Sequence, residues 1–259
     1  MRAYTRRPMD AWTLTVFLVG VLLGSYVQSV TGFAMGMILI ALVTSTQTLG
    51  VPVAAAVVSL LSLVNVLMAI RGHVRAIERR LFIGLAVGQL PAIWVGVWLL
   101  DRLHGNERWL LELALGAFIV FGSLSMLIRP RPRRDVSPPL ACVGAGLAAG
   151  LFGGLFSASG PIMGWFTYRQ PLGVNVIRAT LLGSFILTTS VRTAIVGVQG
   201  ALTAEVWILA AVGMPGVVFG TWAGGRFRPP LSDSGMKRLA FGLLLSLGAW
   251  ILVRAALSF

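Results

Sequence analysis

Charged side chains are scarce in this sequence, and acidic ones are the scarcest. Of its 259 residues, 11% are charged, and 8 acidic residues stand against 21 basic ones. Soluble domains are about one-quarter charged. No charged residue occurs between Ala11 and Ile70, so this stretch has no polar outer face of the kind a soluble domain needs. The shortage of charge excludes a soluble globular fold.

Residues that build catalytic and metal centres are also few. Cys142 is the single cysteine, and the two histidines, His73 and His104, fall between apolar segments. No Cys/His spacing typical of zinc or haem occurs, and neither a Walker-type phosphate loop nor a Ser-His-Asp arrangement can be found. We therefore expect no cofactor, no bound metal and no enzymatic activity.

Carboxylates are missing from the middle of every apolar segment. Glu112 comes nearest, one turn inside its segment. Carriers of cations or protons normally use a carboxylate or histidine within the membrane. Their absence, beside fixed positive and dipolar groups, favours an anionic substrate.

Apolar residues make up 57% of the chain and gather into segments of about membrane-spanning length. About 20 apolar residues cross a bilayer core, so we predict an all-α, multi-pass membrane protein. Its net charge of +13 comes from arginines between the segments, which favours contact with lipid rather than nucleic acid. The predicted segments are Ala11–Val43, Val51–Ile70, Leu81–Leu100, Trp109–Ile128, Leu140–Phe166, Ile177–Val198, Val206–Gly225 and Leu239–Phe259.

One pattern occurs twice, half a chain length apart. It has the same spacing in both copies: Pro91, Gly96, Trp98 and Arg102, then Pro215, Gly220, Trp222 and Arg226. Repeated membrane segments are typical of secondary transporters, in which two copies face each other across a pseudo-two-fold axis. We predict one repeat over residues 1–130, a cytoplasmic Arg- and Pro-rich linker over 131–139, and a second repeat over 140–259.

The charges of equivalent loops predict that the repeats are inverted. Loop Arg71–Arg80 carries four arginines, whereas its equivalent, Gln199–Glu205, carries no basic residue. Loop Arg226–Arg238 is likewise more basic than Asp101–Arg108. Basic loops face the cytoplasm, so equivalent loops fall on opposite sides. The arginines of the N-terminal tail favour an alternative, eight plain spans with the N-terminus inside: Arg2, Arg6 and Arg7.

The first segment of each repeat is too long for one span and has a polar, small-residue centre. That centre reads QSVTGF at residues 28–33 and GGLFSASGP at residues 153–161. Glycine, hydroxyl groups and proline interrupt helices, so we predict two half-helices that meet as a hairpin near the bilayer midplane. Irregular backbone at that depth is tolerated only when it is buried in protein or lines a cavity.

These breaks are the strongest candidate site. Each second half-helix would point its N-terminus, with free N–H groups and a positive dipole end, at the protein centre, where an anion is favoured. Thr31 and Ser159 are the predicted N-caps. Close helix packing is the alternative explanation for the small residues. The predicted substrate-binding residues at the breaks are Thr31, Gly32, Ser157, Ser159 and Gly160.

Two further polar residues fall within spans. Arg192 is a candidate for anion contact, because an arginine in a span is costly and marks a functional site by default; the alternative is that it extends to the interface. Asn65 is a candidate for contact with the substrate, and the alternative is that it forms an interhelical hydrogen bond. Arg178 marks the membrane interface or the mouth of the cavity. Weaker candidates for the lining are Gln28, Gln89, Ser184, Thr188 and Thr189.

The chain resembles the sulfite exporter TauE/SafE family of membrane permeases. The resemblance rests on GLFGGLFSASGP at residues 150–161, on Arg178-Ala179-Thr180, and on the order of segments. The family usually shows consecutive glycines at both breaks, whereas the first break here reads TGFAMG at residues 31–36. The resemblance implies transport of sulfite, an organosulfonate or a related small anion across the bacterial inner membrane.

We therefore predict a secondary transporter that moves a small anion by alternating access. Two alternatives belong to other classes, an integral-membrane enzyme and a non-transporting subunit of a membrane assembly. The sequence leaves open the exact substrate, the direction of transport, the coupling ion and the oligomeric state.

Overall fold

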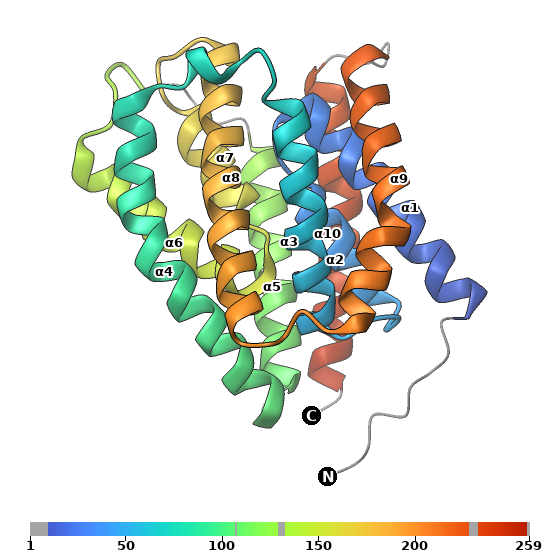
Figure 1. The fold of residues 1–259 in the computed structure, drawn as a ribbon. Helices are drawn as coiled ribbons and strands as arrows, with labels where there is room; N and C mark the ends of the chain where they lie inside the picture. Colours follow the sequence, from blue (N-terminus) through green and yellow to red (C-terminus); the bar gives the residue numbers. More distant parts are fainter. Residues whose placement is uncertain (1–9, 107, 129–132, 228–232, 258–259) are drawn as a thin grey trace.

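The computed structural model describes residues 10–106, 108–128, 133–227 and 233–257, which form a helical bundle without strands (Figure 1). Several sequence features lie outside these ranges, namely the basic tail, residues 131–132 of the linker and residues 228–232 of the second basic loop. The helices are α1 (Ala11–Thr31), α2 (Met35–Ser45), α3 (Val51–Ala69), the 3-10 helix η1 (Val74–Ala76), α4 (Arg79–Asn106), α5 (Arg108–Leu127), α6 (Pro139–Phe156), α7 (Gly160–Tyr168), α8 (Val174–Val198), α9 (Ala204–Arg226) and α10 (Asp233–Leu257).

Seven of the described helices are long and apolar enough to cross a membrane: α1, α3, α4, α5, α6, α8 and α9. The chain is therefore a multi-pass, all-α membrane protein. Two helices are much shorter, α2 with 11 residues and α7 with 9. At about 1.5 Å per residue, each reaches only about halfway through a 30 Å bilayer core.

Both long first segments are interrupted. Gly32 caps the C-terminus of α1, and its φ of 86° lies in the left-handed region that favours glycine. Ser157 caps the C-terminus of α6 in the same region, with φ of 54°. In each case the N–H of this residue donates to the carbonyl four residues earlier, that of Gln28 or Gly153. Three residues separate each pair of helices, so α1–α2 and α6–α7 form two hairpins.

Small residues permit close packing within and between the hairpins. A Cβ at Gly24 would lie 3.2 Å from the backbone of Met35, and one at Gly20 would lie 2.8 Å from Leu39, so α2 folds back along α1. In the second hairpin the N–H of Arg133, just before α6, donates to the carbonyl of Arg169, just after α7, at 2.7 Å. Each hairpin therefore begins and ends at the same end of the bundle.

The two halves pack crosswise. α1 packs chiefly against α9, and α6 against α4, so the first helix of each half lies on the third span of the other. In the same way α2 contacts α10, and α7 contacts α5. α3 with α8 and α5 with α10 complete the centre. This exchange places the two hairpins, and hence the two breaks, next to each other inside the bundle.

Equivalent connections lie at opposite ends of the bundle. The N–H of Glu78, just before α4, donates to Thr180 Oγ1 near the start of α8 at 3.0 Å. The connection from α8 to α9, in contrast, leaves from the far end of α8, and only residues 199–203 separate the two helices. In Figure 1 the connection from α3 to α4 accordingly lies at the top and the one from α8 to α9 at the bottom.

Candidate anion-binding site

A small cavity lies where the two hairpins meet. Its volume is about 20 Å³, room for about one water molecule. Both breaks contribute to its wall, together with one side chain from α3 and two from α8. The residues are Gln28, Ala34, Gly36, Met37, Ser62, Ser157, Ala158, Ser159, Gly160, Phe185 and Thr189. Of the residues predicted from the sequence, Ser157, Ser159 and Gly160 line it, and so do Gln28 and Thr189.

The N-terminus of α2 opens into this cavity. Its first backbone bond within the helix runs from the Ile38 N–H to the Ala34 carbonyl, so earlier N–H groups have no acceptor within the helix. Gln28 satisfies one of them, because its Oε1 accepts from the Met35 N–H at 2.9 Å. With the oxygen so engaged, the Gln28 amide NH₂ remains as a donor at the cavity wall. The N–H groups of Gly36 and Met37 follow at the same helix end.

The prediction that Thr31 caps α2 is wrong. Thr31 is the last residue of α1, and the N-cap of α2 is Ala34, which has φ of 102° and no side chain able to cap. The Thr31 hydroxyl instead contacts two carbonyls, those of Val27 at 2.8 Å and Phe33 at 2.7 Å. A threonine hydroxyl commonly donates to the carbonyl four residues before it. Because the Thr31 hydroxyl makes this bond, it does not cap the N-terminus of α2.

The N-terminus of α7 opens into the cavity from the second half of the chain. Ser159 holds the N-cap position as predicted, and Pro161 follows in the first turn. The Ser159 side chain does not cap the helix, however, because its backbone has φ of −79° and ψ of −4° rather than the extended geometry of a capping residue. The hydroxyl is left available, and the N–H groups of Gly160 and Ile162 have no acceptor within the helix.

Two buried hydroxyls in the cavity wall lack a protein partner among the described residues. Ser159 is 2% exposed and Ser62 is 4% exposed, and neither makes a hydrogen bond to another described residue. Buried polar groups are nearly always hydrogen-bonded. In the cavity wall, these two hydroxyls lie beside two helix N-termini and are not used by the described residues.

Ser157 connects the cavity to α3. Its hydroxyl lies 2.5 Å from that of Ser59 and 3.0 Å from the Ala55 carbonyl. Gly36 packs against the Ser157 backbone with no room for a side chain. A Cβ at Gly36 would lie 2.3 Å from the Ser157 carbonyl oxygen. The two breaks therefore touch through backbone, and the left-handed Ser157 is held in place by the hydroxyl bonds to α3.

Arg192 is buried behind the cavity rather than extended to the membrane interface. It is 1% exposed. Its Nε donates to the Gly154 carbonyl at 2.8 Å, and its Nη1 donates to the Ala55 carbonyl at 2.9 Å and to Ser59 Oγ at 2.7 Å. Arg192 does not line the cavity, but one hydroxyl, that of Ser59, links it to Ser157.

The other predicted residues lie outside the cavity wall. Asn65 is fully buried between α1, α3 and α9, where its Nδ2 donates to Thr221 Oγ1 at 2.6 Å and to the Ser25 carbonyl at 3.3 Å. Both bonds join α3 to another helix, so Asn65 forms the interhelical hydrogen bonds that were the alternative to contact with the substrate. Gly32 lies against Arg178, whose Cγ would be 3.2 Å from a Cβ added there.

Glu112 is buried as well, but it has a cationic partner. Its Oε2 lies 2.9 Å from Nη2 of Arg254 on α10. Arg254 also donates to the carbonyls of Thr44 and Ser45 at the end of α2. No group of three or more Cys, His, Asp or Glu that could hold a metal occurs among the described residues.

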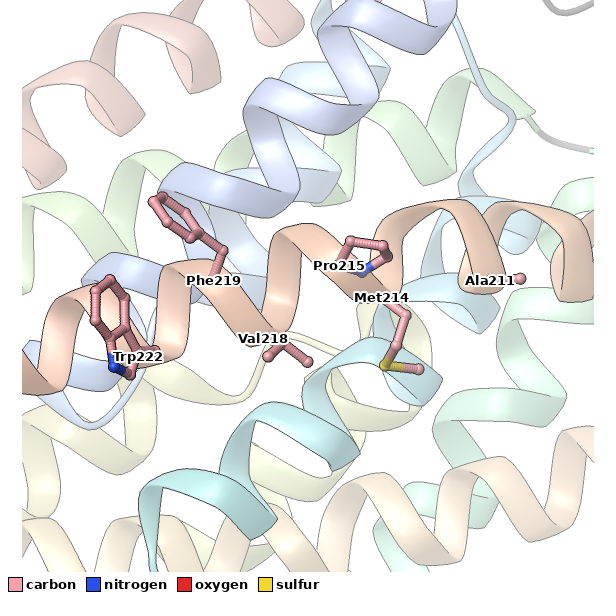
Figure 2. Close-up of a pocket in the computed structure, with 6 residues that line it drawn as sticks. All are labelled: Ala211, Met214, Pro215, Val218, Phe219 and Trp222. Carbon is pink, nitrogen blue, oxygen red and sulfur yellow. The ribbon is translucent and has the colours of Figure 1, made fainter.

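A larger groove of about 590 Å³ lies on one face of α9 and has a different character (Figure 2). Its side chains are apolar, and Phe219 is 58% exposed and Trp222 51% exposed. An apolar, outward face on a membrane helix suits lipid tails, and among its lining side chains only the indole N–H of Trp222 is a hydrogen-bond donor. The lining residues are Ala211, Met214, Pro215, Val218, Phe219 and Trp222.

Ser62 and the close approach of Gly36 to the second break were not predicted from the sequence. A signal was present for the first, since Ser59 and Ser62 are spaced three residues apart and so share one face of α3. Gly36 gave no local signal, because its role depends on the second break, more than a hundred residues later in the chain.

Comparisons with known proteins agree with this architecture. The model of the family described as sulfite exporter TauE/SafE matches residues 16–251. A protein of Cupriavidus necator named "Probable sulfite/organosulfonate exporter TauE" is 39% identical over 232 residues, which cover 90% of this chain and 91% of that protein. No solved structure matches the chain. The protein described here belongs to the sulfite exporter TauE/SafE family.

Proposed function

We propose that this protein is a permease, not an enzyme, that exports sulfite or an organosulfonate across the bacterial inner membrane through the cavity between the two helix breaks. The observation that carries the proposal is the pair of helix N-termini, those of α2 and α7, beside the unpartnered hydroxyls of Ser62 and Ser159. Its membership of the family and the substrates named for the Cupriavidus necator relative give the chemical class.

The cavity wall has the donors that a sulfur oxyanion requires. The residues that carry these donors all line the cavity: Gly36 and Gly160 with backbone N–H groups, Gln28 with an amide, and Ser62 and Ser159 with hydroxyls. Several donors around one anion stabilise oxygen atoms that share a negative charge. Apolar groups complete the wall and would contact the carbon of an organosulfonate: Ala34, Met37, Ala158 and Phe185.

The remaining predicted residues support this wall from behind. Gly32 and Thr31 shape the end of α1, Asn65 ties α3 to α1 and α9, and Arg192 holds the end of α6. In this proposal the substrate contacts Ser157, Ser159 and Gly160 directly. Thr31, Gly32, Asn65 and Arg192 act through the backbone that they hold in position.

Transport proceeds by alternating access of two inverted repeats. The crosswise packing of the halves and the opposite positions of their equivalent loops support this arrangement. Because the cavity holds only about one water molecule, its present volume of about 20 Å³ corresponds to a closed state. A relative movement of the repeats would open it to one side at a time.

A flux assay in proteoliposomes tests the proposal. Vesicles containing the purified protein are loaded with sulfite, isethionate, sulfoacetate or taurine, and release is compared with that from protein-free vesicles and with release of choline. We expect protein-dependent release of at least one sulfur oxyanion and none of choline. Equal release of every solute, or release of none, would overturn the proposal.

A further inference from the structure

Helix ends of both signs meet at the cavity. α2 and α7 begin there and present N–H groups, whereas α1 and α6 end there and present carbonyl oxygens. A helix end behaves as about half an elementary charge, positive at the N-terminus and negative at the C-terminus. Two ends of each sign would nearly cancel, so the breaks by themselves do not explain why an anion would be preferred.

An arginine binds each of the two negative ends. Arg178 donates through Nη2 to the Ser29 carbonyl in the last turn of α1. Arg192 donates through Nε to the Gly154 carbonyl in the last turn of α6, at 2.8 Å. The Tyr168 hydroxyl adds a further bond to α1, 3.2 Å from the Thr31 carbonyl. Cations at a helix C-terminus offset its negative dipole end.

The two arginines occupy the same place relative to their breaks. Ser29 is three residues before Gly32, and Gly154 is three residues before Ser157. Gly32 and Ser157 are the left-handed residues that end α1 and α6. Both arginines come from α8, close to four helical turns apart, so they project from nearly the same face of one helix.

We propose that Arg178 and Arg192 set the charge selectivity of the cavity by neutralising the C-terminal ends of α1 and α6, without contacting the substrate. This inference rests on the proposed anion site. With both negative ends offset, the N-termini of α2 and α7 determine the sign of the field. Arg192 is 1% exposed, and a buried charge is only weakly screened by salt.

The inference makes a prediction that a purely structural role does not. An electrostatic effect scales with the charge of the ligand, whereas a packing defect weakens all ligands alike. Isethionate carries one negative charge and sulfoacetate carries two, on similar carbon frames. Replacing one arginine by glutamine should weaken isethionate binding about tenfold, within the range for cations at buried helix ends, and sulfoacetate binding by about the square of that factor.

The experiment measures dissociation constants for isethionate and sulfoacetate by titration of the purified protein in detergent. The variants are Arg178→Gln, Arg192→Gln, Arg178→Lys and Arg192→Lys. The lysine variants keep the charge and should keep the parental ratio of the two constants, even where both ligands bind more weakly. They also provide folded protein if a glutamine variant does not fold.

A matched control uses a third arginine that binds a helix end far from the cavity. Arg254 donates to Thr44 and Ser45 at the C-terminus of α2 and pairs with Glu112. The double variant Arg254→Gln/Glu112→Gln removes that contact without changing the net charge, and it should leave the ratio of the two constants unchanged.

The outcomes separate the two proposals. Failure of the parent to bind either sulfonate would overturn the proposed function itself. Binding by the parent with equal losses for both ligands in the glutamine variants would overturn the role of the arginines alone. The role of the arginines would also be overturned if a lysine variant changed the ratio of the two dissociation constants as much as the corresponding glutamine variant. The charge of the side chain would then not be the property that matters.

Discussion

At the scale of single residues, the site depends on which hydroxyls the protein leaves unbonded. Thr31, Ser157 and Ser159 are all hydroxyl residues at the helix breaks. The hydroxyls of Thr31 and Ser157, however, contact backbone carbonyls. Ser159 and Ser62 retain donors for a ligand. Sequence alone did not separate these cases, because local φ and ψ values and packing against α3 decide where each hydroxyl points.

Removing a free hydroxyl should reduce anion binding without reducing stability. We expect Ser159→Ala and Ser62→Ala each to weaken binding of isethionate by about 1 kcal/mol, or about fivefold, the typical contribution of a hydrogen bond. Neither hydroxyl bonds to another of the residues that the structure describes, so the melting temperature should stay near that of the parent. Titration and thermal unfolding in detergent measure both quantities. Ser246→Ala, an exposed position on α10, is the control.

Gln28 offers a sharper residue-scale prediction, because its amide oxygen accepts from the Met35 N–H and its NH₂ group is a proposed donor to the ligand. Gln28→Glu retains an acceptor for the Met35 N–H but replaces the donor at the cavity wall with a negative charge. We expect the variant to insert and fold and to lose measurable binding of sulfonates. Titration with isethionate measures binding, and a monodisperse profile of the purified variant shows that it is folded. Parental affinity in Gln28→Glu would show that no anion comes near this side chain.

At the scale of elements, the positions of the breaks were predictable and their internal contacts were not. Glycine, serine and proline at residues 153–161 predict an interruption, and α6 indeed ends at Phe156. The capping of α2 by Gln28, seven residues from Met35, requires α1 and α2 to fold back on each other first. Arg192 likewise donates to carbonyls on α3 and α6, and no local sequence pattern predicts these partners.

The contact between the breaks predicts a strong effect from one methyl group. Gly36→Ala places a Cβ where the Ser157 carbonyl oxygen is only 2.3 Å away, so the hairpins must separate. Overpacking of this kind costs about 1–3 kcal/mol, and we expect lower thermal stability and impaired flux. Gly144→Ala on α6, where a Cβ meets nothing within 4 Å, is the matched control. Similar stability for the two variants would show that the breaks yield easily.

At the scale of the whole molecule, the loop charges predict which end faces the cytoplasm. In Figure 1 the connection from α3 to α4 lies at the end opposite to that from α8 to α9. The first contains arginines and the second does not, so by the positive-inside rule the first is cytoplasmic. This orientation also places the start of α1 on the outer side, contrary to the eight-span alternative.

Thiol labelling of intact cells measures this orientation. Single cysteines replace the exposed residues His73 and Ala201 in a Cys142→Ser background, which keeps a donor toward the Ser137 carbonyl. We expect an impermeant reagent to label Ala201→Cys from outside and His73→Cys only after the cells are opened. Labelling of both positions from outside would contradict the inverted arrangement.

A sulfonate bound in the cavity between the two breaks should protect a cysteine placed there from chemical modification. Ser159→Cys in the Cys142→Ser background is treated with the anionic reagent 2-sulfonatoethyl methanethiosulfonate, with and without isethionate, while Val136→Cys in the linker serves as control. We predict that saturating isethionate slows modification of Ser159→Cys and leaves Val136→Cys unaffected. Modification of Ser159→Cys at the same rate with and without isethionate would contradict the account.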